Sequence, residues 1–184
     1  GPSLLRESLQ TIGVVTESRL CLGDVFASSA DAAMANTTAI ASLEFDDVAL
    51  RGSHPSSIMV PAILAEADRI GASGKAALTA YVAGFEVWAR LIDREQDAYL
   101  QKGWQVTAVI GPIAGAAAVA NLLGLSPSET ASALGFACAA SGGLTASFRS
   151  EARLFQVGLA ARNAVVAARL AQSGLAGGDS GIEG

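Results

Sequence analysis

The abundance of the two smallest residues constrains this sequence more than any other feature. Its 184 residues include 38 alanines and 20 glycines, about a third of the chain, which is well above their usual frequencies. Small side chains let helices approach one another closely. Only 5% of the residues are aromatic, so few large rings are available to fill a core. We therefore predict an all-α protein of closely packed helices.

The apolar run at 106–125 admits two interpretations. It carries no charged side chain and is long enough to span a bilayer. However, Pro112, Asn121 and three glycines lie within it, and a helix rich in alanine and glycine gains little free energy in hydrocarbon. We favour a buried central helix over a membrane span.

Composition also argues against several classes of function. A chain that is 51% hydrophobic and 16% charged is not intrinsically disordered. The net charge of −5, without any block of basic residues, argues against nucleic-acid binding. A single histidine excludes a multi-histidine metal site. The two distant cysteines, Cys21 and Cys138, form no disulfide framework and are typical of a reducing, cytoplasmic location.

Cap and turn signals divide the chain into helices, and no segment alternates as a strand would. We expect helices at 30–43, 61–70, 73–92, 106–124, 127–140 and 151–173. Pro61 suits the first position of the second helix, and Ser126 to Glu129 form a capping box before the fifth. Residues 1–3 are typical of a cleaved tag, 4–175 of a single helical domain and 176–184 of a mobile tail.

The densest polar cluster places three carboxylates close to the only imidazole. Glu44, Asp46 and Asp47 precede His54 by about ten residues. A carboxylate beside a histidine orients the ring and raises its basicity, which suits acid–base catalysis. The alternative is that the acids cap the next helix and His54 satisfies a backbone group.

Two further clusters lie at expected helix starts. Trp104 and Gln105 precede the apolar helix, where backbone N–H groups can hold an anion; the alternative is a plain helix entry. Arg149 and Arg153 can clamp a carboxylate with paired hydrogen bonds; the alternative is a solvated helix start that pairs with Glu151.

Longer segments resemble the MmgE/PrpD family, which includes 2-methylcitrate dehydratase and cis-aconitate decarboxylase. The resemblance runs from about residue 30 to 175 and rests on AAMANTTAIASLEFDD, GSHPSS, ASGKAALTAYVAGFEVWARL and KGWQVTAVIGPIAGAAAVANLLGLSPSETASALGFA. It implies an all-helical domain, usually homodimeric, with its site beneath a smaller α/β lid domain. It also implies the removal of water or CO2 from small di- and tricarboxylates, without a metal or organic cofactor.

Five of the six functional positions of that family differ in this sequence, and only His54 is kept. By this resemblance Glu44 stands for an Asp, Val48 for a Thr, Gln105 for a His, Arg153 for a Lys and Gln156 for a His. Glutamine does not transfer protons near neutral pH, and arginine binds carboxylates without acting as a general acid. We expect anion recognition to survive and the family's proton relay to be lost.

Length is a second departure, because members of the family are more than twice as long. We expect the lid domain to be missing. The chain is then either a naturally short version, in which a second copy completes the core as a dimer, or a piece of a longer protein.

Three functions follow from these observations. The favoured one is a cofactor-independent, lyase-like enzyme that acts on an organic acid or carbonyl-containing metabolite by elimination, isomerisation or cyclisation. The second is a non-catalytic oligomerising or binding module, and the third is the parent tricarboxylate reaction. Under the favoured hypothesis, His54 is the base and is assisted by Glu44, Asp46 or Asp47. The residues that bind the substrate are Trp104, Gln105, Arg149, Arg153 and Gln156.

Overall fold

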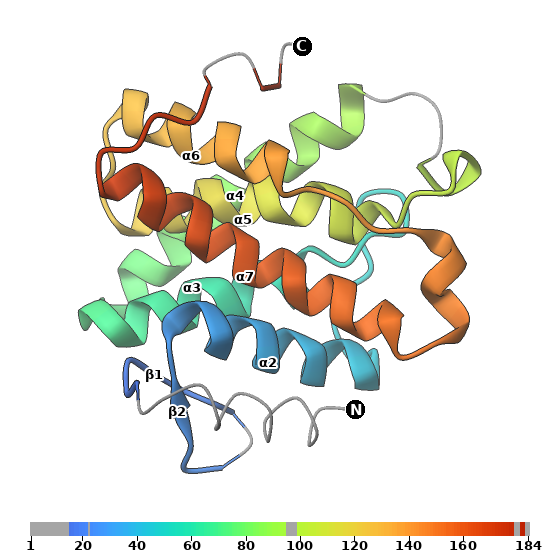
Figure 1. The fold of residues 1–184 in the computed structure, drawn as a ribbon, viewed down its shortest axis with the longest axis horizontal. Coiled ribbons are helices and arrows are strands. Elements are labelled where there is room, and N and C mark those ends of the chain that lie inside the picture. The colour runs from blue at the N-terminus through green and yellow to red at the C-terminus, as the bar shows by residue number, and fades with distance from the viewer. Residues whose placement is uncertain (1–14, 22, 95–98, 179–180, 183–184) are drawn as a thin grey trace.

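A computed structural model describes residues 15–21, 23–94, 99–178 and 181–182, and it has the predicted all-α architecture (Figure 1). Residues 1–3, the expected tag remnant, lie outside the described residues. The helices are α2 (Ser29–Leu43), α3 (Pro55–Ile70), α4 (Gly74–Arg94), α5 (Val106–Leu122), α6 (Pro127–Ala139) and α7 (Ala152–Gln172), with two 3-10 turns, η1 (Tyr99–Lys102) and η2 (Thr145–Arg149).

Two helices form the centre of the molecule. The apolar helix α5 packs against α3, α4, α6 and α7, and α7 in turn packs against α2, α3 and α6. Most side chains of α5 are buried, including Ala114, Ala118 and Val119 with no exposed surface. The run at 106–125 is thus the buried central helix that we predicted. Among the described helices, none combines the length and the apolar character needed to cross a membrane.

Glycines at the helix crossings explain part of the unusual composition. A Cβ atom at Gly115 would lie 2.7 Å from Cβ of Ala164, where α5 crosses α7. A Cβ atom at Gly158 would overlap Thr38 Oγ1 and lie 2.9 Å from the carbonyl oxygen of Met34, where α7 crosses α2. Both distances are shorter than a carbon van der Waals contact. The helices therefore pack at separations that only glycine permits at these positions.

Two predicted helix starts are confirmed by their caps. Ser73 Oγ accepts a hydrogen bond from the N–H of Ala76 at 3.2 Å. Ser126 Oγ accepts from the N–H of Glu129 at 3.3 Å, while the Glu129 carboxylate accepts from the N–H of Ser126 at 2.8 Å. The hydrogen bonds from the hydroxyl and N–H of Ser126 lower the pKa of Glu129.

The predicted start of the second helix is wrong, because α3 begins at Pro55 instead of Pro61. Pro55 takes the first helical position, where its missing N–H costs nothing, and Pro61 lies inside the helix. The polar sequence before Pro61 resembles a loop. In the structure Ser57 is buried, and its hydroxyl donates to the carbonyl of His54 at 2.7 Å. This local hydrogen bond lets a serine-rich turn begin a buried helix.

The structure contains a small two-stranded β-sheet that we did not predict from the sequence. β1 (Ser18–Arg19) pairs antiparallel with β2 (Phe26–Ala27). Strands of two residues are too short to show an alternating pattern. At the other end of the chain, Gly177 is buried against α6, and the mobility of the tail stays a prediction.

Candidate functional site

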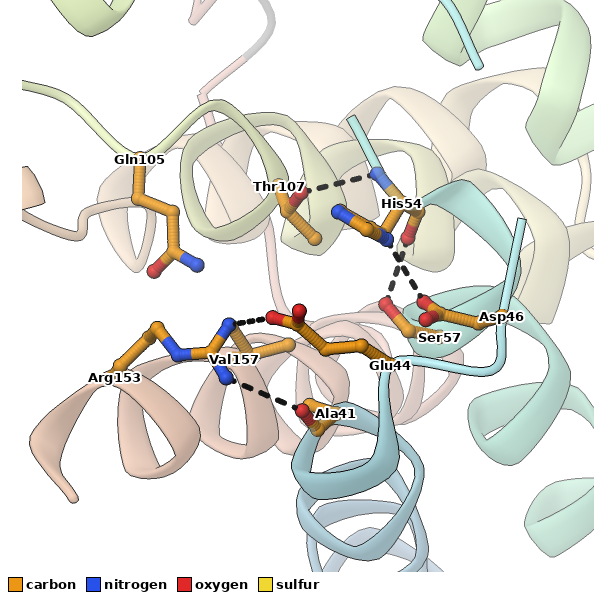
Figure 2. Close-up of a pocket in the computed structure, with 9 residues that line it drawn as sticks. All are labelled: Ala41, Glu44, Asp46, His54, Ser57, Gln105, Thr107, Arg153 and Val157. Atoms are coloured by element: carbon orange, nitrogen blue, oxygen red, sulfur yellow. Dashed lines mark hydrogen bonds and ion pairs between the residues drawn. The ribbon is translucent and has the colours of Figure 1, made fainter. Parts of the chain in front are cut away.

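A pocket forms where α2, α3, α5, α7 and the loop at 44–54 meet (Figure 2). It has a volume of about 20 Å³, room for about one water molecule, and a wider pocket of about 410 Å³ shares five of its lining residues. The shared residues are Glu44, His54, Gln105, Thr107 and Arg153. The narrow part is completed by Ala41, Asp46, Ser57 and Val157, and the wide part by Gly52, Leu100, Val106 and Phe148. Residues from all three predicted clusters therefore line these two adjoining pockets.

Two interactions hold His54 in place, one through its backbone N–H and one through its imidazole ring. Its N–H donates to Thr107 Oγ1 at the start of α5, at 3.1 Å. Its Nδ1 atom lies 3.2 Å from Asp46 Oδ2, and that carboxylate side chain is only 7% exposed. In Figure 2 the other ring nitrogen, Nε2, points toward the space between Gln105 and Arg153. A carboxylate at Nδ1 favours the tautomer in which Nε2 carries a free lone pair, so this arrangement suits a general base.

The loop that carries these groups is strained and supported by the core. Glu44, Leu50 and Arg51 have φ values of 51°, 46° and 65°, in the left-handed region that costs a non-glycine residue about 1 kcal/mol. Ser53 closes the loop with two backbone hydrogen bonds to Ala49, each of 2.9 Å. Such strain persists only where the surroundings enforce the conformation, and it clusters at functional sites.

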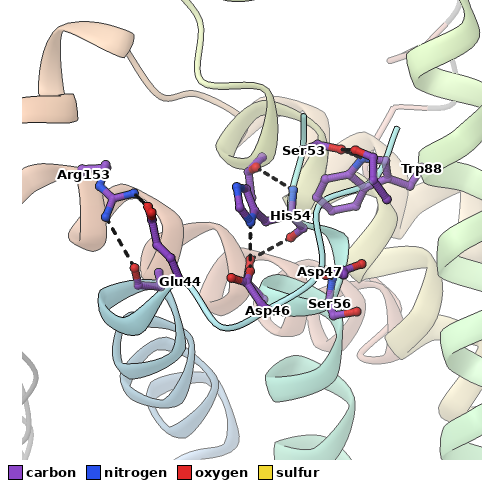
Figure 3. Close-up of polar contacts among 12 residues, drawn as sticks. Glu44, Asp46, Asp47, Ser53, His54, Ser56, Trp88 and Arg153 are labelled. Carbon is purple, nitrogen blue, oxygen red and sulfur yellow. Dashed lines mark hydrogen bonds and ion pairs between the residues drawn. The ribbon is translucent and has the colours of Figure 1, made fainter. Parts of the chain in front are cut away.

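The core enforces this conformation through a tryptophan (Figure 3). The indole N–H of Trp88, a side chain without exposed surface, donates to Ser53 Oγ at 3.1 Å. This hydrogen bond fixes the turn that directly precedes His54.

Asp47 points away from the pocket, in contrast to Asp46. Its Oδ1 atom accepts a hydrogen bond from the N–H of Ser56 at 3.0 Å, in the first turn of α3. This is the capping role that we considered as the alternative for the acidic cluster. Of the three carboxylates, Glu44 and Asp46 line the pocket.

An ion pair joins two parts of the pocket wall that are distant in sequence. Glu44 ends α2, Arg153 lies in the first turn of α7, and their side chains bind each other directly. Arg153 also donates to the carbonyl of Ala41 at 3.5 Å. The arginine side chain is 29% exposed and the glutamate side chain 55% exposed, so the pair remains accessible to a ligand.

The two glutamines pair with each other. Gln156 Nε2 donates to Gln105 Oε1, and Gln156 also accepts from the N–H of Leu144 at 3.0 Å. Gln105 lines the pocket, whereas Gln156 braces the loop behind it and is absent from both linings. Trp104, 42% exposed, and Arg149, at the exposed end of η2, also lie outside both linings.

Several lining residues carried no signal in the sequence. Ser57, Val157 and Leu100 belong to segments that show only helical periodicity or turn composition, and Phe148 precedes Arg149 in a cluster that we singled out for its arginines. Their place in the pocket depends on the packing of the helices. Within the described part of the chain, no group of three or more His, Cys, Asp or Glu side chains is placed to hold a metal ion.

A comparison with known protein families shows the family to which the chain belongs. A family model described as the MmgE/PrpD N-terminal domain matches residues 2–184. The chain belongs to the MmgE/PrpD family.

Curated relatives of this MmgE/PrpD chain are much longer proteins. A cis-aconitate decarboxylase-like protein, oryM, of Aspergillus oryzae is 37% identical over 156 residues, which cover 79% of this chain and 32% of that protein. The cis-aconitate decarboxylases of Aspergillus terreus and Homo sapiens are 35% and 33% identical over 151 residues. These residues cover 78% and 79% of this chain, and 31% of each relative. The chain thus spans about a third of the length of these relatives.

In this MmgE/PrpD domain, four residues that the sequence resemblance assigns to functional positions of the family lie around one pocket. His54, Glu44, Gln105 and Arg153 line the same pocket (Figure 2). The differences that we expect from the family pattern therefore fall around one histidine.

Proposed function

We propose that this chain is a lyase-type enzyme in which His54 removes a proton from an organic acid or carbonyl-containing metabolite. The observation that carries the proposal is the pair formed by His54 and Asp46, with the free ring nitrogen directed into a pocket that also holds Arg153. Arg153 supplies positive charge for a carboxylate or a developing enolate. The relatives named as cis-aconitate decarboxylases support the lyase class.

The proposed reaction starts at the carbon next to the carboxylate or carbonyl group. His54 Nε2 takes a proton from this carbon, and the electron pair of the broken C–H bond forms a C=C bond. In an elimination, the C–O bond of a hydroxyl group on the adjacent carbon breaks, and the hydroxyl leaves with the electron pair of that bond. It then takes the proton from the imidazolium. Water is released and His54 becomes neutral again. Isomerisation and cyclisation share the first step.

The test is a proton NMR screen in D2O, which detects both turnover and exchange of the acidic proton. Its panel contains 2-methylcitrate, citrate, cis-aconitate and larger unsaturated acids. We expect His54→Ala to lower the rate about 10²–10⁴-fold, because it removes the base. His54→Gln keeps a polar side chain, and we expect an equal loss. Thr79→Ala, on the exposed face of α4, is the control and should leave the rate unchanged. Full activity of His54→Ala would contradict the proposal.

A second candidate is a binding module without catalysis. It is favoured by the direct pairing of Gln105 with Gln156 and of Arg153 with Glu44, which satisfies these groups without a substrate. Binding of an acid with neither exchange nor turnover across the panel would support this candidate. The third candidate, decarboxylation or dehydration of a tricarboxylate, is represented by the first three acids of the panel. Independence from cofactors, a homodimer and a cytoplasmic location stay predictions from the resemblance and the composition.

A further inference from the structure

We propose that the substrate is a monocarboxylate with an apolar chain or ring. Its polar head would lie between His54 and Arg153, and its apolar part would extend into the wide part of the pocket, against Leu100, Val106 and Phe148. The inference rests on the proposed function of the same site, and it narrows the substrate to one chemical class.

The charges that line the pocket disfavour small polyanions. With a neutral imidazole, the lining contains the carboxylates of Glu44 and Asp46 and the single guanidinium of Arg153. That guanidinium is already bound to Glu44. A tricarboxylate would meet one cation and two anions in this space, and each unpaired carboxylate would lose hydration without gaining a partner. One carboxylate needs only the one cation.

The wide part of the pocket presents apolar surface that a small polar acid does not need. Leu100 and Phe148 are 49% and 43% exposed, and both line the wide part of the pocket together with the buried Val106. Ligand pockets combine apolar walls with a few polar groups that orient the ligand. Here five polar residues line both parts of the pocket, and the wide part adds three large apolar side chains that the narrow part lacks.

Further large apolar side chains are exposed in the segments that surround this space, on the loop at 44–54 and near the starts of α5 and α7. They are Phe45, Val48, Trp104, Leu144 and Phe155, which are 42% to 93% exposed. Exposed apolar surface of this extent marks a ligand or partner site. Arg149 and Lys102 lie beside the two apolar wall residues in sequence but outside both pocket linings. The experiment must therefore distinguish an apolar ligand from a polyanion held by these cations.

The test is isothermal titration of the 184-residue chain with three unreactive acids: butanoate, octanoate and tricarballylate. Each buried methylene strengthens binding about fourfold, so partial burial of four additional methylenes predicts at least tenfold tighter binding of octanoate than of butanoate. We expect tricarballylate to bind more weakly than octanoate. Phe148→Ala and Leu100→Ala should each lower the affinity for octanoate about three- to tenfold and leave that for butanoate unchanged. Val82→Ala is the matched control, since Val82 is 61% exposed on α4 and outside both linings.

Three results would overturn the inference. One is equal affinity for butanoate and octanoate. Another is tighter binding of tricarballylate that Arg149→Ala weakens. The last is a dimer that dissociates in Phe148→Ala, together with an affinity for acids that does not depend on the length of their carbon chain. This result would assign the apolar side chains to a subunit contact.

Circular dichroism identifies any variant that fails to fold, and the comparison of the three acids on the unsubstituted chain is independent of the variants. These acids undergo no elimination, so the titration is independent of catalysis. A chain-length effect together with an active His54→Ala variant would contradict the proposed function and leave this inference standing.

Discussion

At the scale of single residues, the chemistry of the pocket depends on which nitrogen of His54 carries the proton. Asp46 lies at Nδ1 and is nearly buried, so it should hold the proton on Nδ1 and leave Nε2 as the base. We predict that Asp46→Asn shifts the neutral ring toward the Nε2–H tautomer. We also expect proton abstraction to become about 10²-fold slower or more, because the lone pair then faces the wrong side. The ¹⁵N chemical shifts of the imidazole report the tautomer, and assignment is direct because the chain has one histidine.

The control for this variant is Asp47→Asn. Asp47 is the adjacent carboxylate, but it caps α3 through the N–H of Ser56 and does not line the pocket. We expect Asp47→Asn to leave the tautomer unchanged. Asp46→Glu, which keeps the charge, should recover part of the rate. An unchanged tautomer in Asp46→Asn would show that the carboxylate has no role in orienting the ring.

At the scale of the elements, the site depends on the close crossing of α2 and α7. Gly158 lies in α7 against Thr38 and Met34 of α2, with no space for a Cβ atom. We predict that Gly158→Ala lowers the free energy of unfolding by about 1–3 kcal/mol, because the added methyl group forces the two helices apart. It should also weaken carboxylate binding, since Arg153 lies in α7 and Glu44 directly follows α2. Urea unfolding and titration with butanoate measure the two effects.

Gly74→Ala is the matched control for the helix crossing. Gly74 begins α4, and a Cβ atom there would have no neighbour within 4 Å. Alanine has the higher helix propensity, so we expect this variant to be neutral or slightly more stable. If both substitutions have the same effect on stability, the separation of α2 and α7 does not depend on the glycine.

At the scale of the whole molecule, Glu17 links three parts of the fold. Its carboxylate accepts from the N–H of Ser29 at the start of α2, at 2.9 Å, and from Arg169 near the end of α7, at 3.1 Å. The backbone hydrogen bond from Ser29 and the interaction with Arg169 lower the pKa of Glu17 below its ordinary value of 4.5. A carboxylate with a lowered pKa stabilises the folded chain above its ordinary pKa. That contribution is lost as the pH falls through the lowered value.

We therefore predict that Glu17→Gln lowers the free energy of unfolding at pH 7 by about 1 kcal/mol, and that the difference from the unsubstituted chain shrinks at pH 3. Urea unfolding at both pH values, followed by circular dichroism, measures the change. Glu86→Gln is the control, because Glu86 is exposed and pairs with Arg90 on the surface at 3.9 Å. Its effect should stay within about 0.5 kcal/mol at either pH. A loss for Glu17→Gln that is equal at pH 7 and pH 3 would contradict the role of the charge.

Local patterns in the sequence predict the fold class and most helix boundaries correctly. Small residues and cap signals act within a few positions of the chain, so the start of α6 at its capping box and the buried α5 could be predicted from local patterns. Pro55 and Pro61 show where such patterns fail, because both residues fit a first helical position and only burial of the intervening turn selects Pro55.

The candidate site was determined only in part by the sequence. Residue chemistry singled out His54, Glu44 and Arg153, but nothing local distinguishes Asp46, which faces the histidine, from Asp47, which caps a helix. The apolar wall of Leu100 and Phe148 was not predicted at all. Both points depend on long-range packing. A pocket wall is assembled from segments that lie up to about a hundred residues apart, and the direction of each side chain depends on how those segments pack.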